Sequence, residues 1–156
     1  MPVIHLETFI AAPVSVCFDL NRDIDVHTRS TARTKERAVA GVTSGLIGAG
    51  QYVTWEAVHF GVRQRLTTRV TVCERPHEFV DEQAQGPFEY FTHRHQFREF
   101  QGGTLMIDDF AYASPLGILG RIADALFLER YMRNLLLERA RVIKALAGSD
   151  VNADEA

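Results

Sequence analysis

The sequence predicts an α+β fold in which a curved antiparallel sheet of about seven strands wraps around one long C-terminal helix. Three observations lead to this class. Residues 51–112 alternate between apolar and polar side chains over long stretches that turn residues separate, as half-buried strands do. Residues 119–147 lack proline and carry apolar residues at helical spacing. A strongly twisted sheet needs cover on its concave face, and only this helix is long enough to provide it.

The N-terminal part predicts one strand followed by two short helices. Residues 3–10 alternate and contain β-branched and aromatic residues, which is typical of a strand. A proline at the first position favours a short helix at 13–20. Asn21 and Asp23 could cap a second short helix that runs to about residue 29.

A strand at 34–40 and a glycine-rich loop lead into a long hairpin at 51–73. A two-residue turn at Phe60-Gly61 fixes its register. That register pairs His59 with Val62, Glu56 with Arg65, Trp55 with Leu66 and Tyr52 with Arg69. It also places four apolar side chains on the inner face, namely Val62, Leu66, Val70 and Val72.

After a strand at 79–83, residues 88–100 and 104–112 predict a second hairpin around Gln101-Gly102. Its register forms four cross-strand pairs on one inner face: Phe91 with Tyr112, His93 with Phe110, His95 with Asp108, and Phe97 with Met106. Two histidines and a carboxylate are therefore expected among aromatic side chains on the concave side.

The C-terminal helix predicts an apolar stripe that faces the sheet and a glycine, Gly148, at its end. The stripe consists of Ile118, Ile122, Ala125, Met132, Leu136, Ala140 and Ile143. Glu129 falls in the middle of it, where a carboxylate is costly unless it is paired or reaches water. We expect a domain at 1–147 and a disordered acidic tail at 148–156.

Composition excludes several classes of partner. The chain has 156 residues, 46% of them hydrophobic, and a formal net charge of −3. Without a basic excess, nucleic acid is not expected as a partner, and no apolar run approaches the ~18 residues of a membrane span. The N-terminus is a poor signal peptide, and two cysteines suggest no disulfide framework, so we expect a cytoplasmic protein.

Three stretches carry a family resemblance: GQYVTWEAVHFG at 50–61, RPHEFVDEQAQGPFEYFTHRHQF at 75–97 and GTLMIDDFAYASPLGILG at 103–120. In these the chain resembles the START/SRPBCC superfamily, also called helix-grip or pollen-allergen-like. Within it, the chain is similar to the bacterial polyketide cyclase/dehydrase-like ligand-binding group. The resemblance implies a helix-grip fold with an apolar cavity between sheet and helix. The superfamily includes lipid carriers, hormone receptors, aromatases and cyclases, so the fold does not name the function.

Inward-facing side chains are the candidates for contact with a ligand in such a cavity. They are Trp55, Phe79, Asp81, Phe91, His93, Phe97, Met106, Phe110, Tyr112, Glu129, Met132 and Leu136.

His95 and Asp108 admit three interpretations. They could satisfy each other as a structural pair, anchor a ligand, or act as a general acid/base pair. His93, His95 and Asp108 could also bind zinc or iron, but this spacing is common by chance. We therefore expect no metal and no cofactor.

The leading functional prediction is binding of a small hydrophobic or aromatic molecule, lipid- or polyketide-like, in the central cavity. The first alternative is a cyclase/dehydrase-type enzyme that uses His95 and Asp108. The second is a regulatory or interaction module without catalysis. Its contact surface, or a homodimer contact, would be a second apolar stripe on the helix formed by Phe127, Tyr131 and Leu135.

Overall fold

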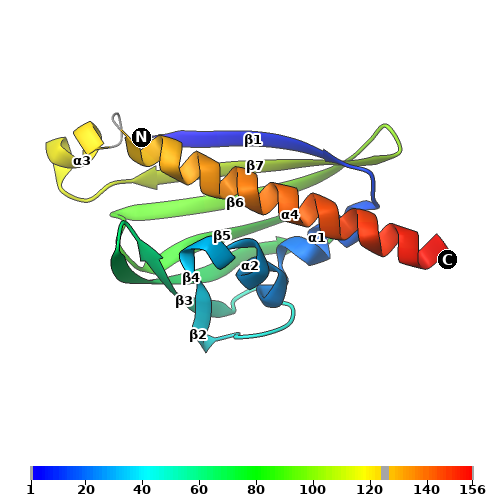
Figure 1. The fold of residues 1–156 in the computed structure, drawn as a ribbon, viewed down its shortest axis with the longest axis horizontal. Helices are drawn as coiled ribbons and strands as arrows, with labels where there is room; N and C mark the ends of the chain where they lie inside the picture. The colour runs from blue at the N-terminus through cyan, green and yellow to red at the C-terminus, as the bar shows by residue number, and fades with distance from the viewer. Residues whose placement is uncertain (1, 124–126, 156) are drawn as a thin grey trace.

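The computed structural model describes residues 2–123 and 127–155. In this part of the chain, seven strands form one antiparallel sheet, and one long helix crosses the sheet (Figure 1). The strands are β1 (Val3–Ile10), β2 (Arg37–Gly41), β3 (Tyr52–His59), β4 (Val62–Glu74), β5 (Glu78–Gln85), β6 (Tyr90–Phe100) and β7 (Gly103–Ala113). The helices are α1 (Val14–Asn21), α2 (Ile24–Ser30), the 3-10 helix η1 (Ala32–Thr34), α3 (Gly117–Ala123) and α4 (Glu129–Glu155). The predicted fold class is confirmed.

The strands follow the order β1-β7-β6-β5-β4-β3-β2, so all neighbours but one are also consecutive in sequence. β1 returns to pair with β7. The helix α4 lies across one face of the sheet and packs against α1, α2 and β1 (Figure 1). The two short helices α1 and α2 therefore cover the part of the concave face that α4 does not cover.

Both predicted hairpin registers are confirmed residue by residue. Phe60 and Gly61 at one turn, and Gln101 and Gly102 at the other, all have positive φ. Two positive φ values in a two-residue loop define the type I′ turn, whose twist matches that of the flanking strands. The turn residues thus set which side chains meet across the sheet.

The inner face of β4 differs from the predicted one near its end. The pairing with β5 shifts between Val70 and Val72, which leaves Thr71 as an extra residue on β4. This bulge turns Val72 to the outer face and points Cys73 inward against the core. Val62 is also exposed because it lies at the hairpin tip. Only Leu66 and Val70 of the four predicted positions face the interior.

The predicted second strand begins later than expected. Residues 32–34 form η1 instead, and Lys35 at its end has a φ of 54°, so the strand starts at Arg37. The predicted cap of the second helix is confirmed, because the Asp23 carboxylate accepts hydrogen bonds from the backbone N–H groups of Asp25 and Val26.

The predicted continuous helix from residue 119 is two helices. A Cβ at Gly120 would overlap the Pro115 carbonyl oxygen, so glycine permits α3 to fold back on the end of β7. Ile118 and Ile122 of the predicted stripe consequently lie on α3 and are 73% and 51% exposed. Ala125 lies outside the described residues. The stripe holds from Met132 onward.

The sequence predicted that the C-terminal helix ends at Gly148. In the structure α4 continues beyond this residue to Glu155. A glycine inside a helix costs only about 1 kcal/mol relative to alanine, and no proline follows it. The predicted division into a domain at 1–147 and a separate tail at 148–156 stays a prediction.

Among the described residues, the interior contains three apolar clusters that share the concave side of the sheet. The first surrounds Phe18 of α1, whose ring meets Phe79 and Phe97 edge to face. The second gathers Phe91 and neighbouring aromatic residues beneath the N-terminal half of α4, and the third surrounds Trp55. Between the second and third clusters, side chains leave a cavity between the sheet and α4.

Ile143 and Ile118 provide a matched test of this helix arrangement. We expect Ile143→Ala, at a position 1% exposed on α4, to lower the free energy of unfolding by about 2–5 kcal/mol. The same change at the exposed Ile118 should cost less than about 0.5 kcal/mol. Urea denaturation of the two variants checks this, and equal losses would contradict the different burial of these two positions on α3 and α4.

Candidate functional site

A cavity of about 290 Å³ lies between the concave face of the sheet and α4. Its apolar wall comes from strands β3, β4, β6 and β7, the β5–β6 connection, and the facing side of α4 with the residue before it. The main apolar contributors are Trp55, Phe88, Phe91, Phe110, Leu128, Met132, Leu135 and Leu136. A few polar side chains also reach the cavity: His27, Glu36, His59, Asp81, His93, Tyr131 and Arg139. Such a mixture is typical of a small-molecule site.

Seven of the residues predicted from the sequence line this cavity, namely Trp55, Asp81, Phe91, His93, Phe110, Met132 and Leu136. Phe79 and His95 instead border a smaller hollow of about 70 Å³ beside it. Phe97, Met106 and Tyr112 are at most 1% exposed and belong to the packed core. The sheet thus divides its inward residues between cavity and core, which alternation alone does not reveal.

Glu129 does not line the cavity. Its side chain is 46% exposed and lies 3.8 Å from Arg133 on the next turn. Because α4 begins at Glu129, a helical wheel counted from residue 118 has the wrong phase there. A carboxylate in the first turn is favourable next to the positive end of the helix dipole.

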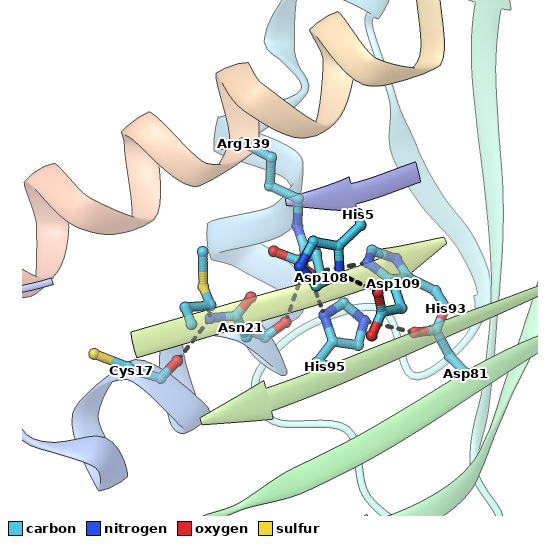
Figure 2. A network of polar contacts seen from close by, with 10 residues as sticks. His5, Cys17, Asn21, Asp81, His93, His95, Asp108, Asp109 and Arg139 are labelled. Carbon is cyan, nitrogen blue, oxygen red and sulfur yellow. Dashed lines mark hydrogen bonds and ion pairs between the residues drawn. The ribbon is translucent and has the colours of Figure 1, made fainter. Parts of the chain in front are cut away.

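His95 and Asp108 are cross-strand neighbours, as predicted, but their hydrogen bonds involve other partners. Asp108 Oδ1 accepts a hydrogen bond from His93 Nε2 at 2.9 Å, and Asp81 Oδ1 accepts one from His95 Nε2 at 2.9 Å. His95 Nδ1 lies 3.0 Å from Asp108 Oδ1 without hydrogen-bonding geometry. Figure 2 shows the four side chains meeting from β5, β6 and β7. Asp81 was predicted to face inward with Phe79, but its bond to His95 was not predicted.

Charges in this network are unevenly divided. Burial opposes protonation of His95, but the Asp108 and Asp81 carboxylates outweigh it and raise the pKa of His95. Burial and the neighbouring His95 lower the pKa of His93 to about 4. Although burial acts against it, the hydrogen bond from His93 and the attraction of the adjacent His95 hold the pKa of Asp108 below its usual range. Near pH 7, a neutral His93 therefore faces the cavity, while His95 behind it holds a proton more strongly than a free histidine.

Asp81, His93 and His95 also place three potential metal-ligand atoms within 4.8 Å of one another. The Nε2 atoms of both histidines, however, already bond to carboxylates. These contacts compensate the buried charges without an ion, and the expected absence of a metal stays a prediction.

A second polar group lies on the side of the cavity formed by α2, β3 and α4. His27 Nε2 bonds to Glu36 Oε1 at 2.8 Å, and the His27 ring stacks on Trp55 at 4.2 Å. His59 Nδ1 lies 2.7 Å from the Tyr131 hydroxyl. Burial lowers the pKa of His59, so its imidazole is neutral near pH 7. Sequence reasoning missed His27, Glu36 and His59, although alternation with Trp55 places His59 on the inner face of β3.

The described part of the chain contains no helix with the length and apolar character that crossing a membrane requires.

Residues 10–141 match the family model described as "Polyketide cyclase / dehydrase and lipid transport". The chain therefore belongs to this family, as its resemblance to the START/SRPBCC superfamily implied. No curated protein matches the sequence closely enough to count as a relative.

Solved structures of the same fold are distant in sequence. The protein TTHA0849 from Thermus thermophilus aligns with a TM-score of 0.78 at 18% identity, over 96% of this chain and 99% of that protein. The di-domain ARO/CYC protein StfQ from the steffimycin biosynthetic pathway aligns with a TM-score of 0.78 at 16% identity, over 96% of this chain and 51% of StfQ. Ara h 8.0201 aligns with a TM-score of 0.68 at 12% identity, over 95% of this chain and 98% of that protein. At these identities the likeness establishes the fold alone.

The lowered pKa of His93 predicts a pH-dependent stability. The unfolded histidine titrates near 6.5 and the folded one near 4, so the unfolded chain binds more protons between these values. Stability should consequently fall as the pH drops through this window, by up to about 1.4 kcal/mol per pH unit from this group. The raised pKa of His95 gives a contribution fully present below 6.5, so it stays constant there.

His93→Gln retains a donor to Asp108 but removes the titration. We expect it to flatten the slope of unfolding free energy against pH between 4 and 6.5, measured by urea denaturation. His77→Gln, at an exposed histidine, serves as the control and should leave the slope unchanged. An unchanged slope in His93→Gln would show that His93 is not buried as a neutral group.

Proposed function

We propose that the protein binds a small hydrophobic or aromatic molecule, of lipid-like or polyketide-like character, in the cavity between the sheet and α4. The observation that carries this proposal is the cavity itself, which aromatic and aliphatic side chains line at the centre of the fold. Membership of a family described by polyketide cyclisation and lipid transport supports the same class of ligand.

The walls favour a flat ligand. Phe91 and Phe110 stack with their ring centroids 5.2 Å apart on the floor, and Phe88 meets both edge to face. Opposite them, Met132 and Leu136 of α4 provide flexible aliphatic surface. A planar ring system between these layers would bury most of its apolar surface.

The arrangement of His95 supports a structural role for it. Its side chain is 2% exposed, stacks on Phe79 at 4.0 Å and lies between two carboxylates. A proton acceptor sealed in this way has no contact with a ligand in the cavity. We propose that His95 and Asp108 position His93, and that His93 is the polar group that a ligand meets.

Filling the cavity tests the proposed binding. We expect Leu136→Trp to abolish, or weaken at least about tenfold, the binding of the neutral fluorescent probe N-phenyl-1-naphthylamine, because the indole occupies the space of the ligand. Fluorescence titration measures this. Lys144→Trp, which adds the same side chain at an exposed position of α4, should bind the probe like the unmodified protein.

Native mass spectrometry of protein from its own host would identify a retained ligand. Failure of the unmodified protein to bind the neutral probe, or equal binding by Leu136→Trp, would count against the cavity as a ligand site.

A second candidate function is a cyclase/dehydrase-type reaction in which His93 transfers a proton. It is favoured by one observation, namely that a neutral imidazole lines the cavity with Asp108 fixing its orientation at 2.9 Å. Incubation with an aromatic poly-β-ketone mimic, followed by mass spectrometry, should then reveal loss of water. His93→Gln should abolish this loss while still binding N-phenyl-1-naphthylamine within about threefold, since the apolar walls remain, whereas a product formed equally by the variant would exclude His93 as the catalytic group.

The stripe of Phe127, Tyr131 and Leu135 is not entirely a free surface. Tyr131 and Leu135 line the cavity, and Tyr131 packs on Phe60 with ring centroids 4.5 Å apart. Only Phe127, at 53% exposed, is largely open to solvent. An interaction role without a ligand is therefore less well supported than binding in the cavity.

A further inference from the structure

Arg139 is a buried cation without an ion-pair partner in the described part of the chain. Its residue is 8% exposed, and it reaches from α4 towards α1 and the histidine network (Figure 2). Nη2 donates to the backbone oxygen of Asn21 at 2.9 Å, while Nε is buried and has no hydrogen-bond partner among the described residues. A buried guanidinium with an open donor is costly unless something else completes its contacts.

The nearby carboxylates are already engaged. Arg139 lies close enough to Asp81 and Glu36 to contribute to the lowered pKa of each. Asp81, however, accepts its hydrogen bond from His95, and Glu36 accepts one from His27. Among the residues that the structure describes, neither carboxylate forms an ion pair with Arg139. The two carboxylates therefore attract the guanidinium of Arg139 through space but do not contact it.

Arg139 also lies at the polar end of the cavity. It borders both the cavity and the smaller hollow, together with His27, Asp81 and His93. The far end, by contrast, is formed by Phe60, Pro87, Phe88, Pro115 and Leu128. Met132, Leu136 and Arg139 follow one another on a single side of α4, so the cavity wall changes from apolar to cationic along the helix.

We propose that the ligand is a hydrophobic molecule with an oxyanion, such as a carboxylate or the enolate of an acidic enol, and that this group binds Arg139. This proposal rests on the proposed function and names the ligand class. The apolar body lies between Phe91 and Leu136, and the oxyanion approaches the guanidinium where Arg139 borders the cavity. Arginine is suited to this role because its planar donors match a delocalised anion, and the interaction strengthens where water is excluded.

A matched pair of ligands tests the proposal. 2-Naphthoate and 2-naphthamide share the same ring system but differ in charge at neutral pH. We expect the unmodified protein to bind the naphthoate about ten- to hundredfold more tightly than the naphthamide, measured by isothermal titration calorimetry at about pH 7.5. In Arg139→Gln this preference should disappear, while the affinity for the amide stays within about twofold.

Two further variants separate ligand recognition from structure. Arg139→Lys retains a charge but not the fork of donors, so it should keep a reduced preference for the acid even if Arg139→Gln does not fold. Arg141→Gln removes an exposed arginine from the same helix and should leave the preference intact.

Equal affinities of the unmodified protein for both naphthalenes, or an acid preference that survives in Arg139→Gln, would overturn the proposal. The proposed cavity function would stand in either case, because the amide still binds. Failure of both naphthalenes and of N-phenyl-1-naphthylamine to bind would instead reject the cavity as a ligand site.

Discussion

The buried carboxylate of Asp108 is the interaction on which the arrangement of the inner sheet depends. Removing a carboxylate from water costs several kcal/mol unless compensating charges and hydrogen bonds accompany it. Here compensation comes from His93 and His95, and His95 in turn requires Asp81. The three strands β5, β6 and β7 must therefore hold one register, since a slip by one residue would leave charges buried without partners. This polar network therefore fixes the positions of the strands whose aromatic side chains line the cavity.

The same network explains how the cavity acquires one polar group and keeps it neutral. Both histidines are almost completely buried. Loss of the proton costs less free energy at His93, whose pKa is lowered, than at His95, whose pKa is raised. His95 lies beside two carboxylates and holds a proton more strongly than His93, and the neutral His93 lines the cavity. Arg139 approaches the same region from the helix. A ligand would thus meet an uncharged imidazole from the sheet and a cation from α4, which gives the two walls different chemistry.

Much of the fold could be predicted from the sequence, because alternation and turn residues act locally. The pairing of His95 with Asp108 followed from a two-residue turn at Gln101-Gly102, and the structure has that register. The bond between His95 and Asp81 depends instead on how β5 lies beside β6, and no turn residue encodes that. Glu36 and Arg139 reach the cavity from segments far apart in the chain. The site was therefore predicted where hairpins form it and missed where tertiary packing does.

The bulge at Thr71 gives β4 two phases of alternation instead of one. Val70 and Cys73 both face the interior although one has an even and the other an odd position number, so the strand changes its inward parity midway. Grafting this strand into a distant relative, or shortening it by one residue, would preserve the inner face on one side of Thr71 and invert it on the other. In sequence alignment with other helix-grip proteins, β4 is best treated as two short strands that meet at the bulged residue Thr71.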